Sequence, residues 1–193
     1  MVKLPDWLTS TLASDAMDGE GAMDGPLPIR SGQLVAGEAS TVTLAAGDNL
    51  DLQEVLRRGP DPGSILVIAS TGPSARAAMG GLVALSMAQR GFRAVVIDGR
   101  IRDVAEIREI EGLQVWCRGL SPVAPGKQGG GQVGGEVSCA GVKVSPGDVV
   151  VADDDGVVVW PAARVQELLT KARARMESDR EREAEIIAGG DLR

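Results

Sequence analysis

The chain of 193 residues contains no histidine and no tyrosine, and it has a single phenylalanine and three tryptophans. Without histidine, the commonest general base and the usual nitrogen ligand of zinc are missing, which excludes Ser-His-Asp catalysis and His-ligated zinc sites. The formal net charge is −7, and few rings are present to stack on bases. Because nucleic-acid binding needs a basic surface and gains from aromatic platforms, we expect no nucleic acid as a direct partner.

Cysteine is also scarce, and long apolar runs are missing. Cys117 and Cys139 lie far apart and match no metal-binding or redox spacing, so we expect two structural thiols in a reducing, cytoplasmic setting. No segment after Met1 resembles a signal peptide, and no run of about 20 apolar residues could span a membrane. With 44% hydrophobic residues the chain can bury a sizeable core, and we predict one domain over residues 1–193.

Strands and helices alternate through the middle of the sequence. Runs rich in Val, Ile or Thr, bounded by Gly, Asp or Pro, predict strands at 34–44, 65–69 and 94–98. Apolar residues at helical spacing predict helices at 51–58 and 80–90. This alternation is typical of the α/β class.

The sequence after Gly119 is rich in strand signals. A stretch at 121–136, whose glycines favour a mobile loop, precedes predicted strands at 137–144, 149–152 and 157–160. Turn chemistry at 145–148 and 155–156 predicts an antiparallel arrangement. After Pro161 we predict a helix over about 162–188, whose charged end lies on the surface or against another subunit.

Several local motif matches lack the context that their chemistry requires. The glycines at 129–134 fit G-x-G-x-x-G, but they neither follow a clear strand nor open a helix. Gly126-Lys127 lacks the first glycine and the Ser or Thr of a P-loop. Three consecutive carboxylates at 153–155 cannot supply the alternating ligands of a calcium loop. Lys143 lies on an alternating strand and is expected to face outward, which does not suit a Schiff-base lysine.

A predicted helix start followed by a buried strand forms the best candidate for a site. Gly80, Gly81 and Leu82 begin the helix, where free backbone N–H groups favour a bound carboxylate or enolate. The strand at 94–98 ends before Gly99, which is expected to permit a sharp exit. The residues that follow would then lie beyond the carboxyl end of the strand, where ligands of α/β sheets usually bind.

Arg102 and Asp103 follow this exit. Arginine binds a carboxylate through two parallel hydrogen bonds, and aspartate oxygens suit a hard divalent cation. An adjacent Arg and Asp can therefore hold a 2-oxo acid together with its metal, although such a pair is also an ordinary surface feature.

Short segments along nearly the whole chain carry a resemblance to a known family. They are residues 14–17, 37–42, 80–83, 96–99, 102–103, 145–148 and 152–161. These segments resemble the RraA-like family, which includes 4-hydroxy-4-methyl-2-oxoglutarate aldolases, oxaloacetate decarboxylases and the regulator of RNase E activity for which it is named. The pair Arg102-Asp103 is the most specific element.

The resemblance implies a compact swivelling β/β/α domain with a C-terminal helix, assembled into homo-oligomers of three or six subunits with a site between subunits. It implies that Asp103 ligates Mg²⁺ or Mn²⁺ and that Glu106, a weaker candidate, orders metal-bound water. The implied substrate-binding groups are Gly80, Gly81, Leu82, Val83 and Arg102, with Arg102 on the 1-carboxylate.

The chemistry implied by the resemblance is Lewis-acid catalysis, in which the metal stabilises the pyruvate enolate left when the C3–C4 bond breaks. Active members carry an acidic residue 21 positions before the arginine, where this chain has Gly81. This departure disfavours aldol cleavage, which needs a base, more than decarboxylation. A neighbouring subunit's acidic residue also approaches the metal waters in trimeric aldolases, and Asp179, Glu181 and Glu183 are candidates here.

Two alternatives to the lyase stay open. The first is a diverged biosynthetic enzyme that uses related enolate chemistry on another substrate, and the second is a non-catalytic regulator that binds a ribonuclease. Pure binding would not require a carboxylate-binding arginine beside a metal-binding aspartate, so the pair favours catalysis.

Overall fold

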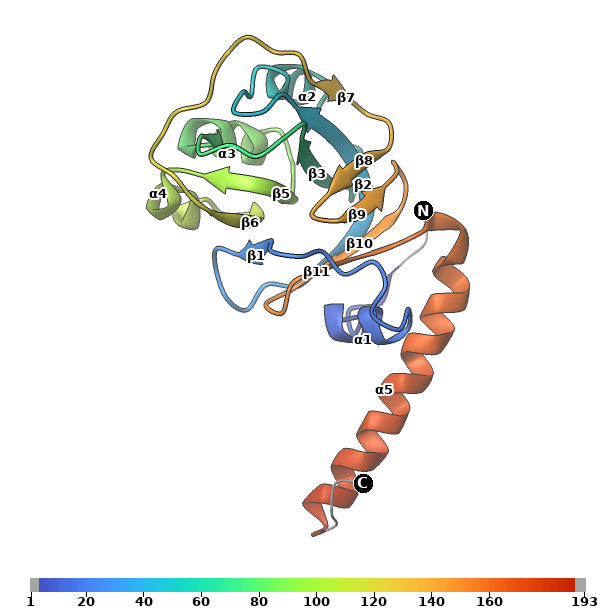
Figure 1. Cartoon of the computed structure of the whole chain (residues 1–193). Helices are drawn as coiled ribbons and strands as arrows, with labels where there is room; N and C mark the ends of the chain where they lie inside the picture. Colours follow the sequence, from blue (N-terminus) through green and yellow to red (C-terminus); the bar gives the residue numbers. More distant parts are fainter. Residues whose placement is uncertain (1–3, 190–193) are drawn as a thin grey trace.

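A computed structural model describes residues 4–189 and shows a central mixed sheet with helices on one face (Figure 1). The strand order is β1-β6-β5-β3-β2-β10-β11, with β4 paired to β5 and β7 paired to β2. The strands are β1 (Leu27–Pro28), β2 (Val35–Leu44), β3 (Ile65–Ser70), β4 (Ala77–Met79), β5 (Ala94–Ile101), β6 (Gln114–Leu120), β7 (Gln132–Val133), β8 (Val137–Cys139), β9 (Val142–Val144), β10 (Val149–Ala152) and β11 (Val157–Trp160). The helices are α1 (Ser10–Asp15), α2 (Leu52–Arg58), α3 (Gly81–Gln89), α4 (Val104–Glu109), the 3₁₀ turn Ala162–Arg164 and α5 (Val165–Ile187).

The central strands are buried on both faces. The centre of the sheet is parallel, as expected for an α/β sheet. The parallel pairs are β2 with β3, β3 with β5 and β5 with β6. Because side chains alternate along a strand, Val95 and Ile97 pack under α2, α3 and α4, whereas Ala94 and Val96 face the opposite core. The predicted α/β class is therefore confirmed.

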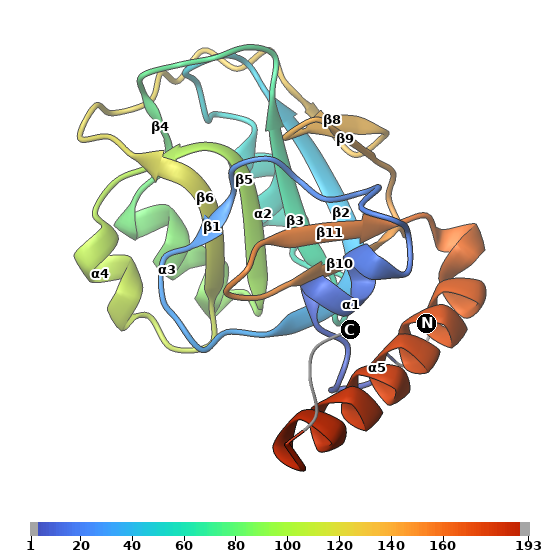
Figure 2. The ribbon, with the colours of Figure 1, turned by 60° about the horizontal axis from the view of Figure 1, so that its bottom comes forward.

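The opposite core is closed by two hairpins. Figure 2 shows β8 and β9 beside the ends of β2 and β3, and β10 and β11 crossing the other part of this face. The single strand predicted at 137–144 is wrong, because the chain reverses at Ala140 and Gly141, which have φ of 51° and 85°. Positive φ at both central residues is the geometry of a tight hairpin turn. The antiparallel pair predicted around Asp155-Gly156 is confirmed as β10 and β11.

Strand β5 is longer than predicted. It continues through Gly99 to Ile101, because Arg100 and Ile101 still pair with Gly119 and Leu120 of β6. The register shifts between Ile97 and Arg100, so the extra residue is absorbed as a bulge. The expected sharp exit at Gly99 is therefore wrong, and the chain leaves the sheet only after Ile101.

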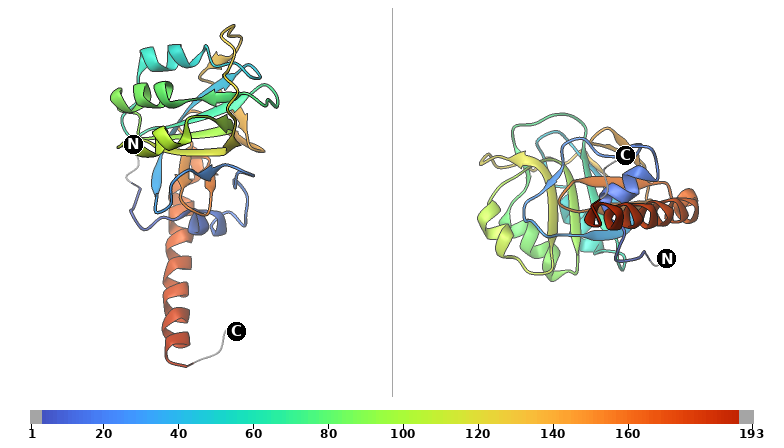
Figure 3. Two further views of the ribbon diagram at one scale, coloured as in Figure 1. Left: turned by 90° about the vertical axis from the view of Figure 1, so that its left-hand side faces the viewer. Right: turned by 90° about the horizontal axis from the view of Figure 1, so that it is seen from below.

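Helix α5 packs on the body with its first half and projects with its second half (Figure 3). Val165, Leu168 and Ala172 are buried against α1 and Trp160, whose indole N–H donates to the carbonyl oxygen of Ala13 (2.9 Å). All residues from 180 to 189 are exposed in the single chain, and packing of this charged end against another subunit stays a prediction. Among the helices of residues 4–189, none has the length and apolar character needed to cross a bilayer.

Both cysteines are free and buried. Burial raises the pKa of Cys117, and burial together with the nearby Asp98 carboxylate raises the pKa of Cys139 to about 12. Both thiols are protonated at neutral pH, which fits structural roles. Lys143 is 81% exposed and pairs with Glu136, so its predicted outward orientation is also confirmed.

Candidate active site

Two helices begin at the same place beyond the sheet. Gly80, in extended conformation, caps α3, and Asp103 caps α4 with a left-handed φ of 58°. The amide of Arg102 donates to the carbonyl oxygen of Met79 (3.0 Å), which joins the end of β4 to the end of β5. The structure thus brings together the helix start and the Arg-Asp pair, as predicted.

The carboxylate of Asp103 lies at the N-terminus of α3. Its Oδ2 accepts a hydrogen bond from the amide of Gly81 (3.1 Å) and lies 3.3 Å from Nε of Arg102. The Arg102 and Asp103 side chains are 37% and 36% exposed, so both remain open to a ligand.

The next amides of α3 are still free to bind. The first amide of α3 that donates to the helix backbone is that of Ala84, which bonds to the carbonyl oxygen of Gly80 (3.0 Å). Over residues 4–189 we find no acceptor for the amides of Leu82 and Val83, as expected for the first turn of a helix. These two amides and the helix dipole form a place for an anion beside Arg102.

Acidic side chains approach Gly80 and Gly81 so closely that a side chain at either position would displace them. A Cβ on Gly80 would lie 2.6 Å from Oδ2 of Asp103, and a Cβ on Gly81 would lie 2.5 Å from Oε2 of Glu106. The carboxylate of Glu106 therefore covers Gly81, in the space that a side chain at residue 81 would enter. The acidic side chain that the family resemblance led us to expect at this position is absent, and an acidic group from α4 lies there instead.

The residues present fit a hydrated Mg²⁺ or Mn²⁺ ion. Within residues 4–189 no three His, Cys, Asp or Glu side chains gather in a way that could hold a metal ion. Mg²⁺, however, keeps several of its waters and is often held by one or two carboxylates together with its substrate. Asp103 supplies one such carboxylate and Glu106, three residues along α4, a second.

The acidic residues predicted to reach a neighbouring site do not approach this one within the subunit. Asp179, Glu181 and Glu183 lie on the projecting half of α5, and Asp179 pairs with Arg175 (3.1 Å). A contribution from them requires another subunit.

Sequence reasoning missed two residues that support the site. Asn49 donates through Nδ2 to the carbonyl oxygen of Ala78 (2.7 Å), in the strand that leads to Gly80, and accepts from Lys127 (2.6 Å). Its neighbour Asp48 is buried. From the sequence, the pair Asp48-Asn49 after a strand indicates only a turn. The neighbouring residues do not reveal that both side chains bind groups about 80 positions further along the chain.

Asp48 fastens the glycine-rich segment to the body. It accepts hydrogen bonds from the amides of Leu50 (2.8 Å), Gln128 (2.6 Å) and Gly129 (3.1 Å). Burial acts to raise the pKa of Asp48, but these amides and the charge of Lys127 outweigh it, and the pKa lies below its ordinary value. The glycines at 129–134 open no helix, in agreement with the rejected dinucleotide motif.

Comparisons with known proteins show the family to which the chain belongs. The RraA-like family model (Aldolase/RraA) matches residues 10–159, and the chain belongs to this family. It is 35% identical over 181 residues to a protein of Halalkalibacterium halodurans named "Putative 4-hydroxy-4-methyl-2-oxoglutarate aldolase", covering 93% of this chain and 85% of that protein.

Two solved structures of the same fold belong to proteins described as RNA-processing inhibitors or their relatives. RraAS2 of Streptomyces coelicolor, described as an unusual member of the RNase ES inhibitor RraA protein family, matches with a TM-score of 0.79 and 28% identity over 94% of this chain and 93% of its own. The RNA-processing inhibitor RraA from Thermus thermophilus matches with a TM-score of 0.70 and 27% identity, over 80% of this chain and 93% of its own.

Proposed function

We propose that this protein is a divalent-metal-dependent lyase that cleaves a carbon–carbon bond in small 2-oxo acids through a pyruvate enolate. Its reaction is of the 4-hydroxy-4-methyl-2-oxoglutarate aldolase or oxaloacetate decarboxylase type. One observation carries the proposal: the Asp103 carboxylate lies against Arg102 at the N-terminus of α3. The name of the relative from Halalkalibacterium halodurans supports the aldolase type.

Arg102 and α3 bind the substrate in this proposal. The guanidinium of Arg102 uses only Nε in its 3.3 Å contact with Asp103, which leaves its terminal N–H groups for the 1-carboxylate of the 2-oxo acid. The amides of Leu82 and Val83 hold the other polar atoms of the pyruvyl unit. The same positive groups stabilise the negative charge that develops when the enolate forms.

Asp103, assisted by Glu106, holds Mg²⁺ or Mn²⁺. When bound, the cation supplies Lewis-acid polarisation of the 2-oxo group. Decarboxylation then loses CO₂ without a base, whereas aldol cleavage requires a group that takes the 4-hydroxyl proton. We propose that Glu106 orders water or accepts that proton, since its carboxylate covers Gly81 and makes no ion pair within residues 4–189.

We infer that the active form is a homo-oligomer, a trimer or a hexamer, with the site at a subunit boundary. Leu82 is 81% exposed and Leu85 is 46% exposed, both on the helix that begins at the site. A second subunit would cover this apolar surface and bring its own α5 acidic residues near. We place the protein in the cytoplasm, where its free thiols stay reduced, without direct nucleic-acid or membrane binding. Light scattering coupled to size-exclusion chromatography measures the oligomer.

Regulation of a ribonuclease is a second candidate function. One solved relative is described as an unusual member of the RNase ES inhibitor RraA protein family, and another as an RNA-processing inhibitor. The two functions differ in a measurable way. A regulator inhibits RNA cleavage by a ribonuclease with or without Arg102, whereas the lyase requires Arg102 and a metal.

Pyruvate release tests the proposed lyase. Oxaloacetate and 4-hydroxy-4-methyl-2-oxoglutarate are each incubated with protein and Mg²⁺, Mn²⁺ or EDTA, with wild type beside Arg102→Ala. We expect metal-dependent release that Arg102→Ala removes, and the preferred substrate decides between the two reaction types. If neither compound releases pyruvate under any metal condition, the result contradicts the proposed lyase. It then favours another enolate-forming substrate or the regulatory function.

A further inference from the structure

A cavity of about 730 Å³ lies at the carboxyl ends of the parallel strands β2, β3 and β5. This is the end of an α/β sheet where ligands bind, and the volume falls within the range of about 300–1,000 Å³ typical of small-molecule sites. The cavity is lined by Ser70 of β3 and Arg100 of β5, among others. It shares Asp48 and Ala78 with the support of the candidate active site, but none of residues 80–83, 102, 103 and 106 lines it. It is therefore a place separate from the candidate active site.

Two arginines at this cavity lack a carboxylate partner. Arg76 donates through Nη1 to the carbonyl oxygen of Ala124 (2.7 Å), and Arg100 donates through Nη1 to that of Leu120 (3.3 Å). Neither makes an ion pair anywhere in the described part of the chain. Both line the same cavity, and they come from neighbouring segments, because Ala77 pairs with Arg100 in the β4–β5 ladder. Two cationic side chains on one cavity wall create a local positive field in a protein of net charge −7.

The acidic side chains of the cavity wall are already engaged. Asp98 forms an ion pair with Arg118 and accepts the amide of Ala140 (2.7 Å). Asp48 is turned to the three amides described above. Neither carboxylate neutralises Arg76 or Arg100, so their charge is directed to whatever enters the cavity.

Hydroxyl groups add further donors to this wall. Ser74 lines the cavity and accepts the amide of Arg76 (3.0 Å) with its oxygen, which leaves its O–H free to donate. Ser138, exposed on β8, lines it as well. Guanidinium and hydroxyl donors together suit the oxygens of phosphate or carboxylate groups.

We propose that this cavity binds a small organic polyanion, a phosphorylated or polycarboxylate metabolite, through Arg76 and Arg100. The two guanidinium groups each engage an anionic group, and the hydroxyls of Ser74 and Ser138 complete the contacts. The site is independent of the metal and of the substrate proposed for Arg102 and Asp103.

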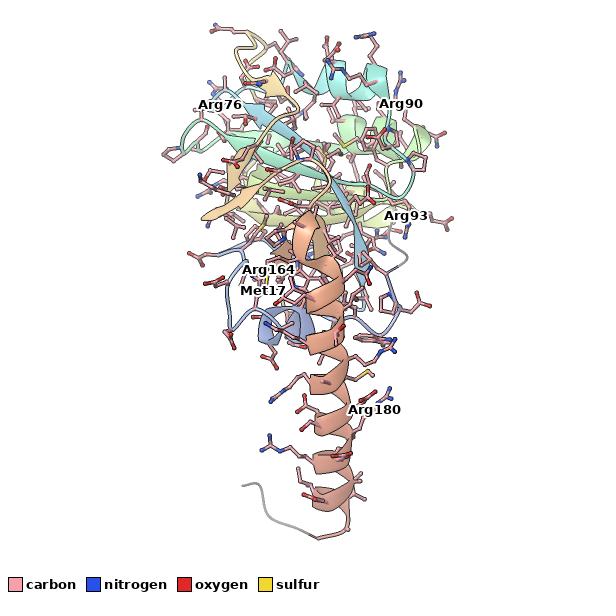
Figure 4. All side chains as sticks on the ribbon, turned by 90° about the vertical axis from the view of Figure 1, so that its right-hand side faces the viewer. Met17, Arg76, Arg90, Arg93, Arg164 and Arg180 are labelled. Atoms are coloured by element: carbon pink, nitrogen blue, oxygen red, sulfur yellow. The ribbon has the colours of Figure 1, made fainter. Side chains whose placement is uncertain are left out.

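Titration calorimetry with pyrophosphate and with citrate tests this site at constant ionic strength. EDTA is present throughout, so that a metal at Asp103 plays no part. The proteins are wild type, Arg76→Ala, Arg100→Ala and, as a second disruption, Ser138→Glu, which places a negative charge in the cavity wall. Arg93→Ala is the matched control, because Arg93 is exposed and lies at the opposite end of the sheet from Arg76 (Figure 4).

We expect saturable binding of at least one polyanion to wild type and to Arg93→Ala, and binding at least about tenfold weaker in the other three variants. Tighter binding of pyrophosphate assigns a phosphorylated ligand, and tighter binding of citrate assigns a polycarboxylate. No saturable binding of either probe up to about 10 mM overturns the proposal. Equal weakening in Arg93→Ala also overturns it, since it indicates unspecific attraction between charges.

Discussion

Asp48 and Asp103 both accept hydrogen bonds from backbone amides, but they use their carboxylates differently. Asp48 is 7% exposed and accepts three amides, two of them 80 and 81 positions along the chain. Asp103 has a side chain that is 36% exposed and accepts one amide, that of Gly81. A carboxylate offers about four acceptor positions, so Asp48 is nearly saturated by the protein and Asp103 is not. Asp48 holds the chain together, whereas Asp103 retains capacity for a ligand.

The strongest test of this comparison is Asp103→Asn. The substitution removes the negative charge that would hold a divalent cation, and we expect kcat/KM for pyruvate release to fall roughly a thousandfold, about 4 kcal/mol. The urea midpoint should stay nearly unchanged because the side chain is partly exposed. The control is Glu109→Gln, an exposed carboxylate on the same helix, which should keep its activity. Activity of Asp103→Asn within threefold of wild type, roughly 0.7 kcal/mol, would remove Asp103 from the mechanism.

Asp48→Asn should instead lower stability. The amide side chain loses the charge that three N–H groups share, and we expect the free energy of unfolding to fall by about 1–2 kcal/mol in urea titrations. Because the folded pKa of Asp48 is depressed, its contribution is complete above its ordinary value of 3.8 and is lost as the pH falls through the folded pKa. The difference in the free energy of unfolding between wild type and Asp48→Asn should therefore shrink as the pH falls below 3.8. A difference that stays constant down to acid pH contradicts this account, and exposed Asp61→Asn serves as the reference.

Glu106→Gln should have a smaller effect on catalysis than Asp103→Asn. We expect about a tenfold loss, since the side chain orders water or takes a proton but is not the first metal ligand. The double variant Gly81→Asp with Glu106→Ala returns an acidic group to the same space from α3. Its activity should exceed that of Glu106→Ala alone. If the two variants are equally impaired, the carboxylate over Gly81 has no catalytic part.

Arg175→Ala should have the smallest effect. Arg175 bridges Asp15 of α1 (3.2 Å) and Asp179 of its own helix (3.1 Å), and these side chains are about half exposed. Exposed ion pairs contribute little, so the free energy of unfolding, measured by thermal denaturation, should change by less than about 0.5 kcal/mol. A much larger loss would mean that α5 is held to the body mainly by charge, and not by the buried stripe that includes Leu168.

Local pattern predicted the parts of the fold in which neighbours in sequence decide the structure. Strands β2 and β3 and helices α2 and α3 lie within a residue or two of the predicted ranges. Helix α3 begins at Gly81 with Gly80 as its cap, one residue after the predicted start. The hairpin at Ala140 was missed because alanine rarely adopts positive φ and no Asn-Gly or Asp-Gly signal is present. The extension of β5 was missed because pairing with β4 and β6 overrides the glycine at position 99.

For the site, the sequence alone predicted the meeting of Arg102 and Asp103 with the start of α3, because both lie at carboxyl ends of adjacent segments. It could not predict that the Glu106 carboxylate covers Gly81, since that depends on how α3 and α4 pack. The cavity at Arg76 and Arg100 was missed for a related reason. Whether an arginine is paired is decided by which carboxylates the fold brings near it, and sequence spacing does not give that.

The three tryptophans report on two parts of the molecule, and with no tyrosine present they dominate the near-ultraviolet signal. Trp116 is buried in the core between the sheet and the hairpins, and its indole N–H donates to the carbonyl oxygen of Asp153 (2.8 Å). Trp160 is buried in the core shared with α1 and α5, while Trp7 lies under Arg173 of α5 (5.8 Å). Replacing two indoles at a time by phenylalanine would give each region its own fluorescence. Coincident unfolding curves would then show that the sheet core around Trp116 and the core shared by α1 and α5 melt as one unit. Separated curves would show that they melt independently, and the earlier curve would identify the part that opens first.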